Sequence, residues 1–321
     1  MIENTDSNTY NTNNNSETQN NDEDDSIFKE TVSYRDLVLY RVEVWWKRPP
    51  TDSIHSKRIC TQPLTLQKLQ TRKGWFCCPY WRRKFSNKFN TRLLVSELLG
   101  IPMAKLYWYG KNPNMIPFHK LPPYYVIRPT SGSGSQGVFV MARGKNLKSN
   151  RVVNAREIVF LLQKYQMKHP YTDFLVEEFI KNEKGLYSVP VDYKIHMFGS
   201  RVAIIQRVTE SDHHRGRHKL YSEDWTPLST SPERILECYP EDIIRAPPKD
   251  LSTMISYAKK IGRIYDHYVR LDFFQSDRGP IFCEFTPTPC LGLHVTETGN
   301  RFLMDHWQSM TPNEYQPDFL K

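Results

Sequence analysis

The chain has 321 residues, with 44 Lys and Arg against 35 Asp and Glu and a formal net charge of +9. Seven of the acids and no cation lie in the first 25 residues, so the remaining chain has a net charge of +16. The length suits two domains or one large divided domain, and the charge favours an anionic partner. No apolar run of ~20 residues is present to cross a bilayer, and the six cysteines form no zinc or disulfide pattern. We therefore expect a soluble cytoplasmic protein.

The first half of the chain contains a polar tail and a basic, aromatic segment before any clear α/β pattern. The first 25 residues are almost all polar and cannot bury enough apolar surface to offset the entropy of ordering, so a disordered tail is predicted. The elements expected next are a strand at 36–46, a basic and aromatic segment at 47–92, a helix at 91–101 ended by Gly100, a strand at 105–110 and a Pro- and Asn-rich connector at 111–123.

A compact alternation of strands and helices follows. Apolar and β-branched runs predict the strands, apolar residues at helical spacing predict the helices, and Asn154 is a good N-cap. The expected elements are strands at 124–129 and 138–141, a helix at 154–166, a strand at 174–180, a hairpin at 191–208, a polar loop at 209–232, a helix at 249–266, a hairpin at 268–286 and a helix at 299–309.

The stretch VIRPTSGSGSQGVFVM (126–141) places a glycine loop, SGSGSQG (131–137), between two of these strands. A Walker loop has Lys followed by Ser or Thr and opens a helix, whereas Val138 and Phe139 predict a strand here, so the loop is not of that type. Two interpretations stay open. Its amides and hydroxyls can bind phosphate oxygens, or the loop is only a turn.

The hairpin 268–286 carries two acids that are symmetric about position 278. If it folds there, Asp272 faces Glu284 and Arg270 faces Thr286 on the same side of the sheet. Two carboxylates ~4 Å apart repel by about 4 kcal/mol at an effective dielectric of 20 and need compensation. Either Mg²⁺, which prefers one or two carboxylates with substrate phosphates, or Arg270 alone supplies it.

The run VDYKIHMF (191–198) carries three polar side chains on one strand face, Asp192, Lys194 and His196. In a hairpin centred on residues 199 and 200, Asp192 falls opposite Arg207 and forms an ion pair with it. Lys194 has no such partner. It therefore either binds a phosphate or is an exposed strand lysine.

Taken in chain order, these segments resemble the ATP-grasp superfamily, and most closely its TupA-like branch, which is linked to teichuronopeptide synthesis. The resemblance implies an α+β ATP-grasp fold in which two α/β subdomains grip ATP. The implied parts are a tail at 1–30, an N-terminal subdomain at 31–120, a glycine-loop lid subdomain at 121–185 and a C-terminal subdomain with the metal site at 186–321. The segments that carry the resemblance are SNKFNTR, LGIP, YYVIRP, SGSGSQGV, FLVEEF, VDYKIHMFG, RLDFF and FCEFTPTP.

The resemblance also implies a role for each matching residue. The loop would close over the phosphates of ATP, and Arg128 stands where the family usually has Lys. The residues implied in nucleotide binding are Lys88, Arg128, Ser131, Gly132, Ser133, Gly134, Ser135, Gly137, the backbone of Glu177 and Ile180 for adenine, Glu183 for ribose, and Lys194. The implied Mg²⁺ or Mn²⁺ ligands are Asp272, Glu284 and Thr286, and Arg270 and Lys194 would neutralise the transferring phosphate.

The function implied is an ATP- and Mg²⁺-dependent ligase that joins a carboxylate to an amine through an acylphosphate, in glycan or peptide decoration. Its expected partners are ATP and an anionic small-molecule, glycan or peptide acceptor. One alternative is an ATP-grasp kinase acting on a hydroxyl, and another is a grasp domain that binds nucleotide without turnover. A third, from another class, is nucleic-acid binding by the basic and aromatic segment 68–92.

Overall fold

The computed structural model describes residues 82 and 85–309, except 133, 171, 210–215, 229–233, 238 and 293. The expected tail, the strand at 36–46 and most of the segment 47–92 lie outside the described residues. Within the part of the chain that is described, none of the helices is long and apolar enough to cross a membrane.

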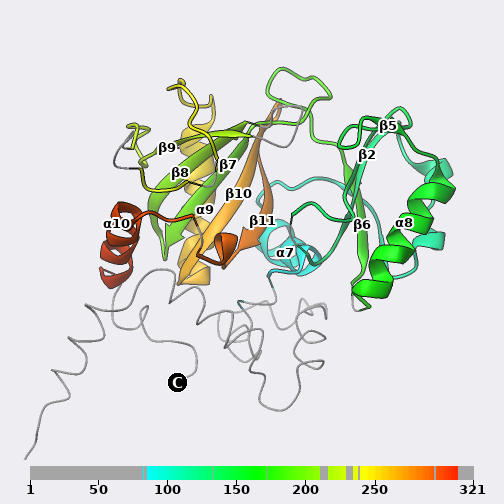
Figure 1. Cartoon of the computed structure of the whole chain (residues 1–321), viewed down its shortest axis with the longest axis horizontal. Coiled ribbons are helices and arrows are strands. Elements are labelled where there is room, and N and C mark those ends of the chain that lie inside the picture. Colours follow the sequence, from blue (N-terminus) through cyan, green and yellow to red (C-terminus); the bar gives the residue numbers. More distant parts are fainter. Residues whose placement is uncertain are drawn as a thin grey trace, which may run out of the picture. The chain divides into compact units, whose positions relative to one another are not determined.

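The first sheet has six strands in the order β1-β6-β2-β3-β4-β5, and neighbouring strands are antiparallel. Helix α8 (Ala155–Lys168) covers one face (Figure 1) and buries Ile158 and Leu162 against apolar residues of β2 and β6. The side chain of Asn154 caps this helix, as predicted, by accepting a hydrogen bond from Glu157 N at 2.9 Å. The strands are β1 (Leu106–Gly110), β2 (Tyr124–Pro129), β3 (Phe139–Ala142), β4 (Lys145–Asn146), β5 (Arg151–Val152) and β6 (Phe174–Glu178).

The opposite face of this sheet carries Arg128 and Glu177. Arg128 pairs with Leu175 across β2 and β6, and Glu177 is two residues further along β6, so all three side chains share that face. The connector 111–123 contains two short 3-10 helices, Pro113–Met115 and Phe118–Lys120. Strand β1 pairs with β6 across the expected subdomain boundary at residue 120, and that boundary stays a prediction.

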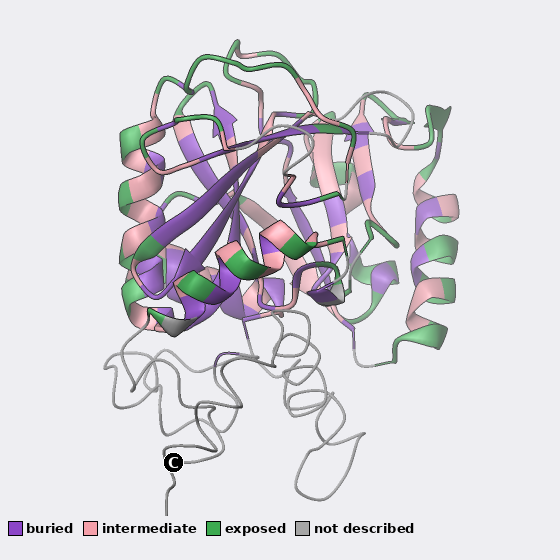
Figure 2. Ribbon diagram, turned by 60° about the vertical axis from the view of Figure 1, so that its left-hand side comes forward, coloured by how far each residue is buried: buried purple, intermediate pink, exposed green. Residues whose placement is uncertain are grey.

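The second sheet has five antiparallel strands in the order β11-β10-β7-β8-β9. Its long strands are mostly buried (Figure 2) because helix α9 (Leu251–Tyr265) covers one face with Met254, Ala258 and Ile261. A Cβ added at Gly262 of this helix would lie 2.2 Å from Gly199 O, so only glycine allows the helix to approach the β7–β8 turn so closely. The strands are β7 (Asp192–Phe198), β8 (Arg201–Thr209), β9 (Arg217–Tyr221), β10 (Tyr268–Ser276) and β11 (Gly279–Thr286).

The two faces of β10 divide the apolar core from the polar site. Val269, Leu271 and Phe273 pack into the core beneath α9, so the alternate residues Arg270 and Asp272 point to the other face. At one end that other face is covered by α10 (Glu297–Gln308), which begins at the N-cap Thr296 and packs Leu303, Met304 and Trp307 on Phe198 and Tyr268. The rest of the face is free to hold polar side chains.

The helix expected at 91–101 begins earlier and changes its winding. It consists of α7 (Lys88–Arg92), capped by the side chain of Asn87, and a π-helix at Leu93–Leu98. Gly100 ends it with a φ of 64°, as expected. Leu94 and Val95 are buried in the core of the five-stranded sheet. Helix α7 therefore lies beside β11 (Figure 1).

The expectation of a single polar loop at 209–232 is wrong. The segment RHKLY forms strand β9 and pairs with β8 from Ile205–Tyr221 to Thr209–Arg217. Its charged residues conceal the strand in the sequence, although His218, Lys219 and Tyr221 are all buried. Hydrogen bonds to neighbours, such as the 2.8 Å contact between Gln206 Nε2 and His218 Nδ1, allow these polar groups to be buried.

Candidate nucleotide and metal site

Asp272 and Glu284 face each other across β10 and β11, and Arg270 faces Thr286, as the symmetry of the hairpin predicts. The route to this register differs from the expectation. The chain turns between Ser276 and Gly279, half a residue before position 278, and a β-bulge at Cys283 restores the pairing. The two acids therefore share one sheet face.

Asp272 is buried and surrounded by cations. Arg270 donates from Nε to Oδ1 and from Nη2 to Oδ2, each at 2.7 Å, and Lys194 Nζ lies 3.2 Å from Oδ2. Arg270 Nη2 also donates to Thr286 Oγ1 at 3.1 Å. Burial opposes the charge of Asp272, but Arg270 and Lys194 outweigh it and lower the pKa of the carboxyl to about 2. The carboxylate is therefore ionised at neutral pH.

The expected pairing of Asp192 with Arg207 is wrong. A β-bulge at His196 and Met197 shifts the register of β7 and β8, so that Asp192 faces Val208. Arg207 instead binds Asp242, with a distance of 3.0 Å between Nη1 and Oδ2. Lys194 is not free either, because its ammonium bridges Asp192 and Asp272. The interpretation of Lys194 as an exposed strand lysine is excluded.

Lys88 connects the acid pair to the glycine loop. Its Nζ lies 3.2 Å from Glu284 Oε2 and donates to Gly132 O at 3.4 Å, while its backbone N donates to Thr130 O at 2.8 Å. Burial opposes the charge of Glu284, but Lys88 is the strongest opposing influence and the pKa of this carboxyl is lowered. One side chain thus joins the two parts of the predicted site.

The glycine loop wraps around Tyr165 of α8. A Cβ added at Gly132, where φ is 127°, would lie 2.5 Å from Tyr165 Oη, and Gly137 packs on the same ring. Tyr165 Oη donates to Ser131 O at 3.3 Å, and the hydroxyl of Ser131 contacts Thr172 Oγ1 at 3.1 Å. These contacts with Tyr165 and Thr172 therefore fix the conformation of the loop.

The other predicted loop residues, Gly134 and Ser135, adopt positive φ in its turn, and Ser133 lies outside the described residues.

Arg128 interacts electrostatically with Glu284 of the acid pair, but its side chain is bound to Glu177. Its Nε donates to Glu177 Oε2 at 2.5 Å, and Arg92 Nη1 donates to Glu177 Oε1 at 2.6 Å. Burial opposes the charge of Arg128, but Glu177 and then Glu284 outweigh it and raise the pKa of the guanidinium. Arg128 therefore senses both glutamates and stays charged.

The predicted adenine and ribose contacts lie where β6 leaves its sheet. Ile180 is buried, and within the described residues its N–H makes no hydrogen bond. Glu183 lines a cavity of about 230 Å³ with Gln275, which points to the α9 side of β10, away from Asp272. In the described part of the chain, Glu183 makes no hydrogen bond or ion pair with the acid pair. Its ribose role stays a prediction.

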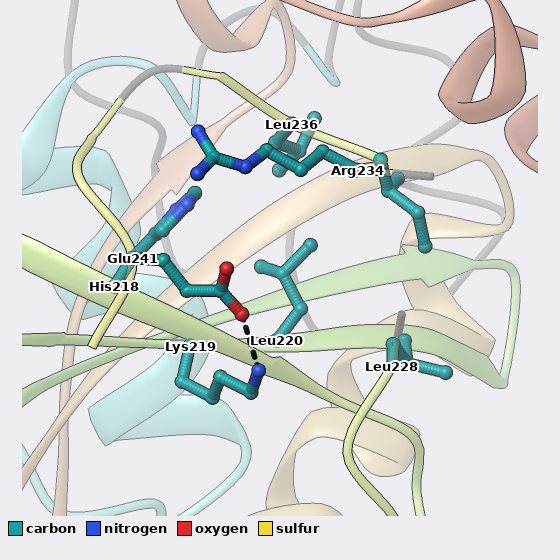
Figure 3. A pocket seen from close by; sticks show the side chains of 8 residues that line it. His218, Lys219, Leu220, Leu228, Arg234, Leu236 and Glu241 are labelled. Atoms are coloured by element: carbon teal, nitrogen blue, oxygen red, sulfur yellow. Dashed lines mark hydrogen bonds and ion pairs between the residues drawn. The ribbon is translucent and has the colours of Figure 1, made fainter. Parts of the chain in front are cut away.

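A small pocket lies beside β9 (Figure 3), on the segment that was expected to be a polar loop. Lys219 Nζ pairs with Glu241, and the pocket volume of about 10 Å³ has room for one water molecule. Burial lowers the pKa of His218 to about 4. This pocket is too small for an acceptor group. His213 and His214 lie outside the described residues.

The donor set at the acid pair suits Mg²⁺. Among the described residues no group of three or more His, Cys, Asp or Glu gathers as a metal cluster. Asp272, Glu284 and the hydroxyl of Thr286 nevertheless offer only oxygen atoms on one sheet face. Mg²⁺ prefers such a set, with one or two carboxylates and the rest of its shell from phosphates and water. The residues present therefore fit this ion.

The paired sheets, the glycine loop and the facing acids define the ATP-grasp class of proteins. A model of the TupA-like ATPgrasp family matches residues 76–305, which is more than half of the chain. The chain belongs to the TupA-like ATP-grasp family. No curated protein sequence matches it.

Solved ATP-grasp ligases resemble this chain at low identity. D-alanine–D-alanine ligase from Bacillus anthracis, complexed with ATP, has 13% identity and a TM-score of 0.46 over 71% of this chain and 67% of its own. The Helicobacter pylori enzyme has 16% identity and a TM-score of 0.43, over 71% and 62%. The ligase PsnB, complexed with a phosphomimetic variant of its minimal precursor, Mg and ADP, has 12% identity and a TM-score of 0.41, over 72% and 60%. The chain thus spans about three fifths to two thirds of the length of these proteins.

Three residues of the site escaped the sequence analysis as contributors. Arg92 binds Glu177, Tyr165 supports the glycine loop, and Asp192 binds Lys194. Arg92 follows Lys88 by four residues, a spacing that places both on one helix face and could have drawn attention to it. Tyr165 carries no such signal, because its contact depends on how α8 packs against the loop.

Proposed function

We propose that the protein is an ATP- and Mg²⁺-dependent ligase that joins a carboxylate to an amine through an acylphosphate. The main support is the position of Lys88, whose ammonium contacts both Glu284 of the acid pair and Gly132 O of the glycine loop. The expected metal ligands and the expected phosphate loop are thus one side chain apart. A nucleoside triphosphate bound between the metal ligands and the loop requires that they lie this close together.

In this proposal the nucleotide lies between the two sheets. Lys88 and Arg128 bind phosphate oxygens, and the amides of the glycine loop cover them. The adenine edge meets the backbone C=O of Glu177 and the N–H of Ile180, and the ribose binds Glu183.

The residues that would hold Mg²⁺, or Mn²⁺ in its place, are Asp272, Glu284 and Thr286. When bound, such an ion neutralises and orients the phosphate oxygens. Arg270 binds both oxygens of Asp272 and would share that carboxylate with the ion. The acids Asp192, Asp272 and Glu284 on this face are matched by the cations Lys88, Lys194 and Arg270. A bound phosphate would therefore add negative charge, which the ion would neutralise.

The chemistry proceeds in two steps. A carboxylate oxygen of the acceptor attacks the γ-phosphorus, the bond to the β–γ bridging oxygen breaks, and ADP leaves. The amine then attacks the acyl carbon, phosphate leaves, and the ammonium loses a proton. Arg270 and Lys194 stabilise the charge on the transferring group, and the protein contributes mostly position and charge. The net charge of +16 outside the first 25 residues suits an anionic glycan or peptide acceptor.

Trapping of the acylphosphate tests this reaction. The full chain is incubated with Mg²⁺, ATP, a panel of candidate carboxylates and hydroxylamine, and hydroxamate formation is measured. We expect a hydroxamate with ADP in equal amounts, and none with the Glu284→Gln variant. A stable phosphorylated alcohol formed without hydroxamate would show a kinase instead and would overturn the ligase proposal.

A further inference from the structure

We propose that Arg92 is a positioning residue that keeps Arg128 available to nucleotide phosphate by occupying the second oxygen of Glu177. The inference rests on the proposed role of Arg128 in binding ATP. It assigns to α7 a function beyond the contact of Lys88, because Arg92 and Lys88 stand four residues apart on one short helix.

Glu177 is shared evenly by two arginines. Its side chain is 2% exposed, its Oε2 accepts from Arg128 Nε at 2.5 Å, and its Oε1 accepts from Arg92 Nη1 at 2.6 Å. Arg92 also donates from Nη2 to Ala104 O, which fixes its guanidinium from the other side. Each guanidinium therefore holds one carboxylate oxygen.

This sharing leaves the outer edge of Arg128 unused. Within the described residues, Nη1 and Nη2 of Arg128 make no hydrogen bond. Two parallel N–H groups on one guanidinium match two phosphate oxygens, so these nitrogens suit a bidentate contact that a lysine cannot make. A contact of this kind requires that Glu177 take only Nε of Arg128.

The same protein shows how one arginine can bind both oxygens of a carboxylate. Arg270 holds Asp272 side-on, with Nε on Oδ1 and Nη2 on Oδ2 at 2.7 Å each. Without Arg92, Oε1 of Glu177 is free, and we expect Glu177 to bind Arg128 in this side-on manner. In that arrangement Nη2 would bind Glu177 instead of phosphate, and the carboxylate would compensate the charge of the guanidinium.

The electrostatic cost falls on Arg92 itself. Burial lowers the pKa of Arg92, although Glu177 opposes the shift, and the nearby charge of Arg128 adds to the lowering. Two guanidiniums on one carboxylate give this cluster a net positive charge. The excess faces the side of the sheet that carries Arg128, where a phosphate would compensate it.

The experiment measures the dissociation constant of Mg·ATP for four chains: wild type, Arg92→Met, Arg128→Ala and the double variant. We expect Arg92→Met to weaken binding about tenfold, and to add no further loss in the Arg128→Ala background. Adenosine, which has no phosphate, should bind to wild type and Arg92→Met equally. Arg92→Lys, which keeps a cation at Oε1, should recover most of the affinity.

Arg207→Met is the matched control. The side chains of Arg207 and Arg92 are each 12% exposed, and each binds an acid. Arg207, however, lies on β8 of the five-stranded sheet, where it pairs with Asp242. Its variant should lose stability without a change in the dissociation constant of Mg·ATP. If Arg92→Met does not fold, Arg92→Gln serves the same comparison.

An equal loss of affinity in the wild-type and Arg128→Ala backgrounds, or a parallel loss for adenosine, would overturn the inference and leave Arg92 a structural residue. An unchanged affinity in Arg92→Met would overturn it as well. A different result, in which Arg128→Ala binds Mg·ATP as wild type does, would instead refute the proposed role of Arg128 itself.

Discussion

At the scale of single residues, burial decides the protonation of the histidine nearest the site. His196 is 3% exposed, and its Nδ1 lies 3.0 Å from Tyr268 Oη. Burial, and then the charge of Arg270, lower its pKa to about 3. The unfolded chain takes up this proton near pH 6.5, whereas the folded chain stays neutral. Stability is therefore lost as pH falls through 6.5, and the loss continues until about pH 3.

We expect His196→Gln to reduce the loss of unfolding free energy between pH 7 and pH 5 by about 2 kcal/mol, because the titrating group is gone. Urea unfolding at the two pH values measures it. His119 is exposed, and His119→Gln serves as the control substitution at the surface. The same slope in wild type and His196→Gln would show that His196 is protonated in the folded state.

Lys194 is the residue on which the charge balance of the site depends. Its ammonium bridges two buried acids, Asp192 and Asp272, and these raise its pKa against the effect of burial. We expect Lys194→Met to lower the free energy of unfolding by about 3 kcal/mol, because both acids lose their shared cation. Denaturant titration measures the change.

Lys259 supplies the comparison for Lys194. It pairs with Glu223, and both side chains are more than a third exposed, so Lys259→Met should cost less than about 1 kcal/mol. Equal losses for Lys194→Met and Lys259→Met would mean that Lys194 is solvated and that the buried bridge does not form.

At the scale of elements, the glycine loop makes its closest approach to α8 at Gly132. Gly132→Ala would bring a Cβ to 2.5 Å from Tyr165 Oη at a φ of 127°, whereas a Cβ at Gly134 meets nothing within 4 Å. We expect Gly132→Ala to weaken Mg·ATP binding and to cost about 2 kcal/mol of stability, and Gly134→Ala to cost about 1 kcal/mol. Binding and thermal unfolding of both variants check this, and equal effects would contradict the tight fit against Tyr165.

The strands show how far a sequence can predict register. The symmetry of Asp272 and Glu284 predicts their pairing, and the structure confirms it because a bulge at Cys283 offsets the position of the turn. The same reasoning fails for Asp192 and Arg207, because the bulge at His196 and Met197 has no counterpart at the turn. A bulge has no clear sequence signature, so a hairpin without a second constraint cannot be registered by symmetry.

At the scale of the whole described molecule, the site depends on contacts between segments far apart in the chain. Arg92 and Glu177 are 85 residues apart, and Lys88 reaches both the glycine loop and β11. Motifs in chain order predicted the ATP-grasp fold, which the family match confirms. They did not predict that Glu177 binds Arg92 and Arg128, because Glu177 appeared only as a backbone contact and Arg92 lay within a predicted helix. Tertiary packing alone decides those pairs.

The metal dependence of ATP binding tests the central claim most directly. Calorimetric titration with ATP, at rising Mg²⁺, compares wild type with Asp272→Asn and Glu284→Gln. We predict that Mg²⁺ strengthens ATP binding to wild type and that each variant loses this gain by about tenfold or more. Wild-type Mg²⁺ dependence in both variants would contradict a metal site at this acid pair.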